Sequence, residues 1–408
     1  MKRMHIFQVG TIFTLSSFAL GITIPVLSLL VLDRGFDLSG LAVVMGAYGI
    51  AVVVMEIPSG IIGDTYGRKA CFLLAKGCTA LGSVLIAIAR NDVLFVIAIV
   101  SLALARAFIS GSFEALVIDW HNERFGQLAL HRITTLISIW DTVGLSAGAL
   151  VAGFVTIGSN RLLALDGPYD GNFLLSGMLN ALLFLLSWFW IEESKKGTRR
   201  TEGTGFAPVF RFLRHQGLLA ALMLSAIATG FILSSIEKYW QPRLLAIGGK
   251  QEHTTVLLGL LAFVGFISAL GGTILSGHLT GTRKSSVVPL FILWRIVLSG
   301  AAIALALSTG GMGYGVSYGL FYLVLGLAGI PEQVMLNRLI PNHLRASVLS
   351  VSSFCLQAGG LASSAFAAWF LASEGRGIGE LWIISSVVIA SALIPFAFRG
   401  KRWSGQSA

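Results

Sequence analysis

The feature that most constrains this chain is the recurrence of long apolar runs along its whole length. A run of about 18 or more apolar residues is long enough to cross the hydrocarbon core of a membrane as a helix. The sequence holds twelve such runs, separated by charged residues, glycine or proline. They cover approximately 7–31, 40–62, 70–89, 93–118, 132–157, 172–191, 217–240, 254–277, 287–308, 315–337, 346–370 and 379–398. We therefore expect an all-α polytopic membrane protein with twelve transmembrane helices.

The composition agrees with a lipid bilayer as the surroundings of the chain. Apolar residues make up 55% and charged residues 12%, whereas soluble domains carry about 25% charged residues. The mean hydropathy is +0.83. The formal charge of +10 could indicate nucleic-acid binding, but the basic residues lie in short clusters between the apolar runs. We expect no nucleic-acid partner.

The residues that enzymes and metal sites use are not grouped along the chain. The three cysteines lie within apolar runs and lack metal-ligand spacing, and the seven histidines lie in loops or near helix ends. A nucleotide-binding loop of the form Gly-x-x-x-x-Gly-Lys-Ser/Thr does not occur in the sequence. The sequence therefore predicts neither an enzyme nor a primary pump, and no cofactor or metal.

The longest polar stretch, Glu192–Gln216, divides the chain into two halves. We expect a six-helix bundle over 1–191, a cytoplasmic linker over 192–216, and a second six-helix bundle over 217–408 that ends in a short basic tail. With the N-terminus inside, about nineteen Lys and Arg residues lie on the cytoplasmic side and about six outside. Both termini are therefore predicted to be cytoplasmic, in a multi-pass protein of a bacterial inner membrane.

The two halves share short sequence motifs. Ser59-Gly-Ile-Ile-Gly-Asp-Thr-Tyr-Gly-Arg-Lys69 follows the second apolar run, and a degraded copy, Ser276-Gly-His-Leu-Thr-Gly-Thr-Arg-Lys284, follows the eighth. Arg132 and Arg345 open the fifth and eleventh runs in similar contexts. An internal repeat of this kind is typical of transporters whose binding site lies between the halves near the midplane.

The first copy contains Gly60, Asp64, Gly67, Arg68 and Lys69 in the pattern G-x-x-x-D-x-x-G-R-K. This pattern matches a signature of the major facilitator superfamily, and the chain resembles that family over its whole length. Glycine permits a tight turn that brings an acid and a base to neighbouring helix ends. The resemblance implies that these residues latch the two halves in one state of alternating access.

The resemblance also implies an acid at the cytoplasmic end of the fourth helix, which Asp119 supplies. Asp64, Arg68 and Asp119 would then form a charge relay. The alternative is that Arg68 and Lys69 simply follow the positive-inside rule, although that rule does not explain the spacing of the glycines and the aspartate.

The fifth apolar run departs from an element that antiporters of this family often carry there, Gly-Pro-x-x-Gly-Gly. The chain has Gly144-Leu-Ser-Ala-Gly-Ala-Leu-Val-Ala-Gly153 instead, without the proline. The Gly-x-x-x-Gly spacing predicts a face for close helix packing, which we favour over an antiport signature.

Several ionisable residues fall inside the apolar runs, where each costs about 2.5–3.5 kcal/mol on insertion scales unless it has a partner, a wet cavity or a function. Arg106 lies near the middle of the fourth run and Asp141 in the fifth. The resemblance implies that the fourth helix lines a central cavity, and we expect the two residues to pair. Asp141 or its partner would be the proton or substrate site, or the pair would be structural.

Three glutamates are further candidates for substrate binding or proton coupling. Glu332 follows Pro331 in the tenth run, and we expect it to face the cavity. Glu114 and Glu56 lie near the ends of the fourth and second runs. Either of these two could equally brace the latch, and for Glu56 we favour that role.

Glu237 and Trp240 lie in a polar and aromatic stretch at the end of the seventh run. The resemblance makes this region a gating element, whereas an interfacial anchor is the ordinary role of tryptophan there. We expect Arg295 to be structural and at the periphery of the bundle, and Lys76 to reach the membrane surface from a helix end.

These observations predict a secondary active transporter that moves a small molecule by alternating access, coupled to protons and functional as a monomer. The apolar, aromatic-containing runs and scattered acids are similar to bacterial proton-coupled exporters, which favours efflux of amphipathic drugs or metabolites. Uptake of a sugar or organic anion is the alternative, but an anion importer is expected to place more than one base in its cavity. A transport-like membrane sensor is the third hypothesis.

Overall fold

The computed structural model describes residues 5–109, 112–125, 130–163, 165–191, 216–248, 252–281, 287–341 and 344–396. Within these ranges the regular structure is α-helical, apart from a short 3₁₀ contribution at Leu344. The predicted linker, except Gln216, and the basic tail lie outside the described residues, as do Arg283 and Lys284. The helices are α1 (Ile6–Thr23), α2 (Leu27–Asp33), α3 (Leu38–Tyr66), α4 (Arg68–Ile88), α5 (Asp92–Ile109), α6 (Phe113–Phe125), α7 (Leu130–Leu163), α8 (Asp170–Trp190), α10 (Gly217–Gly248), α11 (Glu252–Gly281), α12 (Val288–Leu307), α13 (Gly311–Leu339), α14 (Arg345–Leu371) and α15 (Ile378–Ser391).

The described residues contain twelve helical stretches that are long and apolar enough to cross a membrane, as predicted. Two of these spans consist of two helices each. α1 and α2 meet at Pro25, which has no N–H to donate and whose ring clashes with the preceding turn. α5 ends at Ile109 and α6 begins at Phe113, and the chain bends at Ser112 directly before α6, so the fourth span is not the single continuous helix that the sequence predicted.

By its internal contacts the chain divides into two compact units. Unit 1 consists of 1–36, 44–200 and 250–263, and unit 2 of 37–43, 201–249 and 264–408. The division into bundles at 192–216 stays a prediction.

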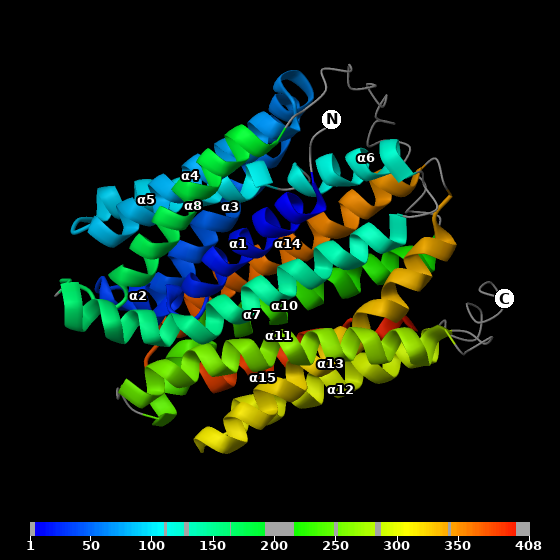
Figure 1. The fold of residues 1–408 in the computed structure, drawn as a ribbon. Helices are drawn as coiled ribbons and strands as arrows, with labels where there is room; N and C mark the ends of the chain where they lie inside the picture. Colours follow the sequence, from blue (N-terminus) through cyan, green and yellow to red (C-terminus); the bar gives the residue numbers. More distant parts are fainter. Residues whose placement is uncertain are drawn as a thin grey trace. The chain divides into compact units, whose positions relative to one another are not determined.

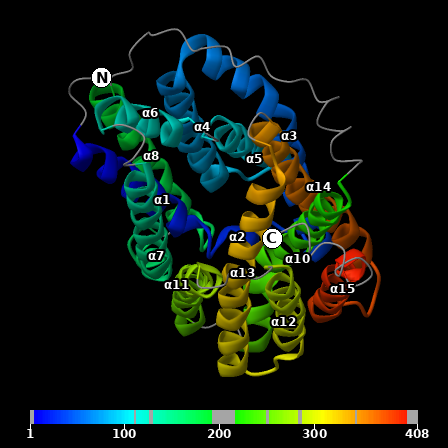
Figure 2. The same ribbon diagram turned by 90° about the vertical axis from the view of Figure 1, so that its right-hand side faces the viewer.

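The two units repeat the same set of helix pairings (Figures 1 and 2). In unit 1, α1 packs on α7 and α8, and α4 packs on α5 and α8. In unit 2, α10 packs on α14 and α15, and α12 packs on α13 and α15. In each half, the first span therefore packs on the fifth and sixth, and the third span on the fourth and sixth. The packing thus repeats as the sequence motifs do.

Glycines bring the backbones of α1 and α7 into close contact. A Cβ added to Gly144 would lie 2.3 Å from the carbonyl oxygen of Thr14, and one added to Gly148 would lie 2.2 Å from that of Phe18. Only glycine fits at such distances. The packing face predicted at 144–153 is therefore present at these two positions.

Unit 2 uses the same device between α10 and α14. A Cβ on Gly230 would lie 1.9 Å from the carbonyl oxygen of Leu356, and one on Gly359 would lie 1.9 Å from that of Ile227. Small residues that permit close backbone contact are the usual basis of helix association in a membrane. Lipid tails are as apolar as the side chains, so apolar side chains gain little by moving from lipid to a helix interface.

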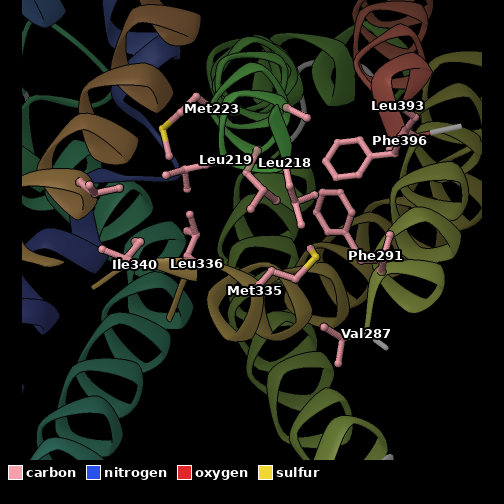
Figure 3. Packing of buried hydrophobic residues seen from close by; sticks show 14 of the residues in the cluster. Leu218, Leu219, Met223, Val287, Phe291, Met335, Leu336, Ile340, Leu393 and Phe396 are labelled. Atoms are coloured by element: carbon pink, nitrogen blue, oxygen red, sulfur yellow. The ribbon is translucent and has the colours of Figure 1, made fainter. Parts of the chain in front are cut away.

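At one end of α10, an apolar cluster joins several helices of unit 2 (Figure 3). Leu218 of α10, Phe291 of α12 and Met335 of α13 meet there, with Phe396 close to Phe291. The ring centroids of Phe291 and Phe396 are 5.2 Å apart, a distance typical of favourable aromatic pairs.

Candidate functional site

Unit 1 contains a cavity of about 460 Å³ between its helices. Four charged residues line it, each from a different helix: Lys76 (α4), Arg106 (α5), Glu114 (α6) and Asp141 (α7). The formal charges of these four residues balance. An unmatched charge inside a membrane is costly. Two bases and two acids that share one cavity lower this cost, because the opposite charges offset one another.

The remainder of the wall combines aromatic rings with hydroxyl and amide groups. The rings come from Phe13, Tyr48, Phe72, Phe113 and Phe173. The hydroxyl and amide groups come from Ser16, Ser17, Thr23, Thr79, Ser83, Ser176 and Asn180. A mainly apolar wall with a few polar groups is typical of small-molecule sites.

Asp141 is held by α1. The hydroxyl of Ser17 donates a hydrogen bond to Oδ1 of Asp141. The close approach of the two helices makes this contact possible, because a Cβ on Gly144, three residues after Asp141, would lie 2.9 Å from the Cβ of Ser17. The side chain of Asp141 is nevertheless exposed on the cavity side, so the carboxylate is oriented and also accessible.

The expected ion pair of Arg106 with Asp141 is not formed. Both residues line the cavity, but no salt bridge between them occurs among the described residues. The guanidinium of Arg106 instead acts electrostatically on Tyr48 of α3, and the charge of Asp141 acts on Lys76. Both residues line a cavity of unit 1, but the predicted ion pair is absent, because pairing depends on how each helix is rotated about its axis.

Lys76 was expected to reach the membrane surface, but it does not. Its residue exposure is 3%, and it lies on the cavity wall. Its ammonium donates a long hydrogen bond of 3.4 Å to Oδ1 of Asn180 and lies 5.1 Å from the ring centroid of Phe72. Lys76 is therefore a second base inside the cavity, which the sequence analysis missed.

A pattern in the sequence could have revealed this wall. Lys76, Thr79 and Ser83 are spaced at i, i+3 and i+7 in α4, so they share one helix face. Ser176 and Asn180 are spaced at i and i+4 in α8. A polar stripe of helical period within an apolar helix indicates a face turned away from lipid.

The predicted latch residues lie in the last turns of α3, around the start of α4 and in α6. Nη1 of Arg68 is 2.5 Å from Oδ2 of Asp119, so the expected pairing of these two residues is present. Nζ of Lys69 donates to the carbonyl oxygen of Trp188 at 2.8 Å. Gly67 has φ +94°, a conformation that favours glycine, and α4 begins directly after it.

The other members of the proposed latch are less closely defined. The side chain of Asp64 lies outside the described residues, so its part in a relay stays a prediction. Gly60 has no neighbour within 4 Å of a Cβ built on it, so space alone does not require glycine there. Glu56 is exposed, and its carbonyl oxygen accepts a hydrogen bond from the hydroxyl of Ser59.

Glu332 of α13 forms an ion pair with Arg295 of α12, with 2.5 Å between Oε2 and Nη2. Arg295 is 1% exposed and its guanidinium lies 5.2 Å from the ring centroid of Phe291. Arg295 is thus buried within unit 2 and not peripheral as expected. Because the carboxylate of Glu332 neutralises a buried cation, a structural role is favoured for it.

Glu237 and Trp240 of α10 lie in different surroundings. Glu237 is exposed, and its charge acts on Tyr318 and Tyr322 of α13. Trp240 is 2% exposed, its carbonyl oxygen accepts a 2.8 Å hydrogen bond from the hydroxyl of Tyr314, and its ring lies 5.1 Å from that of Tyr318. A buried tryptophan of this kind is part of an aromatic core, so it is not an interfacial anchor.

The sequence analysis also missed a charged cluster beside the N-terminus of α8. Asp170 is 2% exposed and binds Arg34 at 2.5 Å and Arg90 at 3.1 Å. Arg34 also donates to the carbonyl oxygens of Ile86 and Ala87 at the end of α4, which have no partner in their own helix. These contacts tie the ends of three helices together.

The comparisons with known proteins agree with this architecture. The sequence model of the Major Facilitator Superfamily matches residues 9–401. The chain is 26% identical over 417 residues to a tetracycline resistance protein, class C, of Escherichia coli, covering 97% of this chain and 96% of that protein. It is 24% identical over 384 residues to the 4-hydroxybenzoate transporter PcaK of Pseudomonas aeruginosa, covering 91% and 79% respectively.

Among solved structures, the fold is similar to that of the nucleoside transporter NupG. The TM-score is 0.74 with 16% sequence identity, and the match covers 97% of this chain and 98% of that one. The twelve apolar spans, the repeated helix pairings and the match over nearly the whole sequence lead to one conclusion. The chain belongs to the Major Facilitator Superfamily and is a multi-pass membrane transporter that moves a solute by secondary transport.

Proposed function

We propose that this transporter is proton-coupled and exports small amphipathic drugs or metabolites, acting as a monomer in a bacterial inner membrane. The observation that carries the proposal is the cavity of unit 1. It combines aromatic walls with two accessible carboxylates, Asp141 and Glu114. An amphipathic solute places its apolar body against the rings and its polar group against the charged residues.

Proton coupling requires a group that binds either a proton or the solute during the cycle. Carboxylates inside a membrane are typical proton sites of transporters because they are costly when charged and unmatched. Asp141 suits a part in this exchange, as the site of the solute or of the proton, since Ser17 orients it while the cavity leaves it accessible. The similarity to a tetracycline resistance protein supports export, although it supports no particular substrate.

The second candidate is uptake of an organic anion. Lys76 and Arg106 both line the cavity, which meets the expectation that an anion importer has more than one base there. The similarity to a 4-hydroxybenzoate transporter supports this alternative. The two acids on the same wall offset the two bases, so we place it second.

The Arg68–Asp119 pair is proposed to act in the conformational cycle and not in solute binding. It lies outside the cavity lining, and both side chains are partly exposed to solvent. Exposed ion pairs contribute about 0–1 kcal/mol, so the pair can break and form again at low cost during alternating access.

Proton movement in proteoliposomes tests the proposed function. The purified protein is reconstituted with a pH-sensitive dye inside, and amphipathic cations, neutral drugs, sugars and organic anions are added in turn. We expect proton flux with amphipathic compounds, and expect Asp141→Asn to abolish it. Asp92→Asn is the matched control because Asp92 is exposed at the start of α5, outside the cavity lining.

Direction and substrate class follow from the same preparation. Accumulation of the solute in inside-out vesicles on acidifying their interior supports export by exchange with protons. If proton flux occurs only with organic anions and is lost in both Arg106→Gln and Lys76→Met, the result would support anion uptake and contradict export. No flux with the whole panel from folded protein would contradict proton-coupled transport of these compounds.

A further inference from the structure

Lys76 lies too deep in its helix to place its charge at the membrane surface. It is the ninth residue of α4, Arg68–Ile88, which corresponds to about 12 Å from the helix start at 1.5 Å per residue. Its neighbours leave it only 3% exposed. An ammonium in such a position needs hydrogen-bond partners or a counter-ion to stay charged.

The partners that Lys76 has are weak. Among the described residues its ammonium makes one hydrogen bond, 3.4 Å long, to the neutral amide of Asn180, although an ammonium offers three donors. The ring of Phe72 adds a cation–π contact at 5.1 Å. No salt bridge joins Lys76 to Asp141 in the described part of the chain.

The charge of Asp141 supports the charged form of Lys76. The two residues line the same cavity, and the field of the Asp141 carboxylate acts on the Lys76 ammonium. The other ionisable residues on the cavity wall are Arg106 on α5, Glu114 on α6 and Tyr48 on α3. Arg106 disfavours a second cation nearby, whereas Glu114 favours one.

We propose that Lys76 is the proton-exchanging group of the cavity, and that the exported solute is an amphipathic cation which binds Asp141 and displaces the Lys76 proton. This inference rests on the proposed function and deepens it.

The exchange balances in atoms and charge. When the cation binds beside Asp141, one N–H bond of the Lys76 ammonium breaks, the proton passes to water in the cavity, and the lone pair stays on Nζ. When the cation leaves, water returns a proton to Nζ. The cavity holds one mobile positive charge at every stage, either the solute or the proton, so solute and proton move in opposite directions.

Lysine suits this role and arginine does not. A lysine loses its proton readily when it is buried, whereas the guanidinium of arginine stays charged in proteins. Lys76→Arg therefore keeps the positive charge and removes the ability to exchange it. Lys76→Met removes both the charge and the proton.

The test uses purified protein in detergent, in a weakly buffered solution with a pH indicator. The probe is tetraphenylphosphonium, a permanently charged cation with no exchangeable proton, so any released proton comes from the protein. We expect wild type to release about one proton per bound cation, and its affinity to rise about tenfold per pH unit while Lys76 is protonated. Lys76→Met is expected to bind without proton release and without that pH dependence.

Two further variants complete the test. Lys76→Arg is expected either to bind tetraphenylphosphonium without releasing a proton or, because the arginine keeps its charge, not to bind it. Asp141→Asn is expected not to bind tetraphenylphosphonium. Lys238→Arg is the matched control, because Lys238 is another buried lysine in a spanning helix but lies outside the cavity lining. It is expected to behave as wild type.

Proton release from Lys76→Met or Lys76→Arg equal to that of wild type would overturn the assignment to Lys76. Absence of tetraphenylphosphonium binding to folded wild type would overturn the cationic substrate class. Both results are separable from failure of the proposed function, which would show instead as no proton flux in proteoliposomes with any compound of the panel.

Discussion

Gly144→Ala tests whether the close packing of α1 on α7 holds the cavity together. The added Cβ would lie 2.3 Å from the carbonyl oxygen of Thr14 and 2.9 Å from the Cβ of Ser17. Ordinary contacts of a Cβ begin at 3.4 Å, so the helices must separate locally by about 1 Å. Such a shift also draws the Ser17 hydroxyl away from Asp141.

The expected loss of stability can be worked out from that displacement. Overpacking costs about 1–3 kcal/mol, and the upper end applies because the obstacle is a backbone oxygen in a helix. Replacing glycine by alanine within a helix returns about 1 kcal/mol. We therefore expect a net loss of about 2 kcal/mol for Gly144→Ala. Gly158→Ala in the same helix meets no atom within 4 Å, so it should gain up to about 1 kcal/mol.

The two substitutions are expected to change the stability in opposite directions, so comparing them tests the packing argument directly. The midpoint of thermal unfolding is measured on purified protein in detergent with a thiol-reactive dye, which reports exposure of the free cysteines, among them the buried Cys71. Gly144→Ala should unfold at a lower temperature than wild type and bind tetraphenylphosphonium more weakly. A midpoint for Gly144→Ala equal to or above that of Gly158→Ala would refute the packing argument.

Three further predictions concern ion pairs. Glu332→Gln should cost about 3–5 kcal/mol by leaving Arg295 as an unmatched buried charge, and adding Arg295→Met should restore most of the loss in the unfolding midpoint; additive losses would contradict the pair. Asp119→Asn should change the free energy of unfolding by less than about 1 kcal/mol, because the side chain of Asp119 is 60% exposed. The same substitution should reduce the rate of proton flux in proteoliposomes. A normal rate would remove the latch role of Arg68. Asp170→Asn should destabilise the fold by about 1.5–3 kcal/mol through weakened charged hydrogen bonds, so an unchanged unfolding midpoint would show that this cluster contributes little.

The transmembrane architecture follows from the sequence because it depends on local composition. A stretch such as 70–89 is apolar and long enough to span a membrane whatever its neighbours are, and the corresponding helix, α4, extends over Arg68–Ile88. The bend at Pro25 depends on one residue. The bend at Ser112 lies within an apolar run, so hydropathy did not reveal it.

The site could be predicted only in part. Asp141, Arg106 and Glu114 were recognisable because charge is rare inside apolar runs, and all three lie on the cavity wall. Lys76 was equally visible in the sequence, yet its proximity to a helix end suggested an exit to the membrane surface. Its true position depends on which face of α4 turns toward α8.

Glu332 shows the same limit. Its helix and depth were predictable, but its partner Arg295 comes from another helix, and only the packing of α12 on α13 brings the two together.

The sequence by itself determined the number of spans, the repeat of the two halves, the family and the residue types available for chemistry. These properties are set by hydrophobicity and short motifs, which act over neighbouring residues. Only the tertiary structure decided that Asp141 accepts from Ser17, that Lys76 faces the cavity, and that Arg295 is buried. These contacts depend on the rotation of each helix about its axis, and that rotation is set by packing between helices, as where Gly144 meets the backbone of α1.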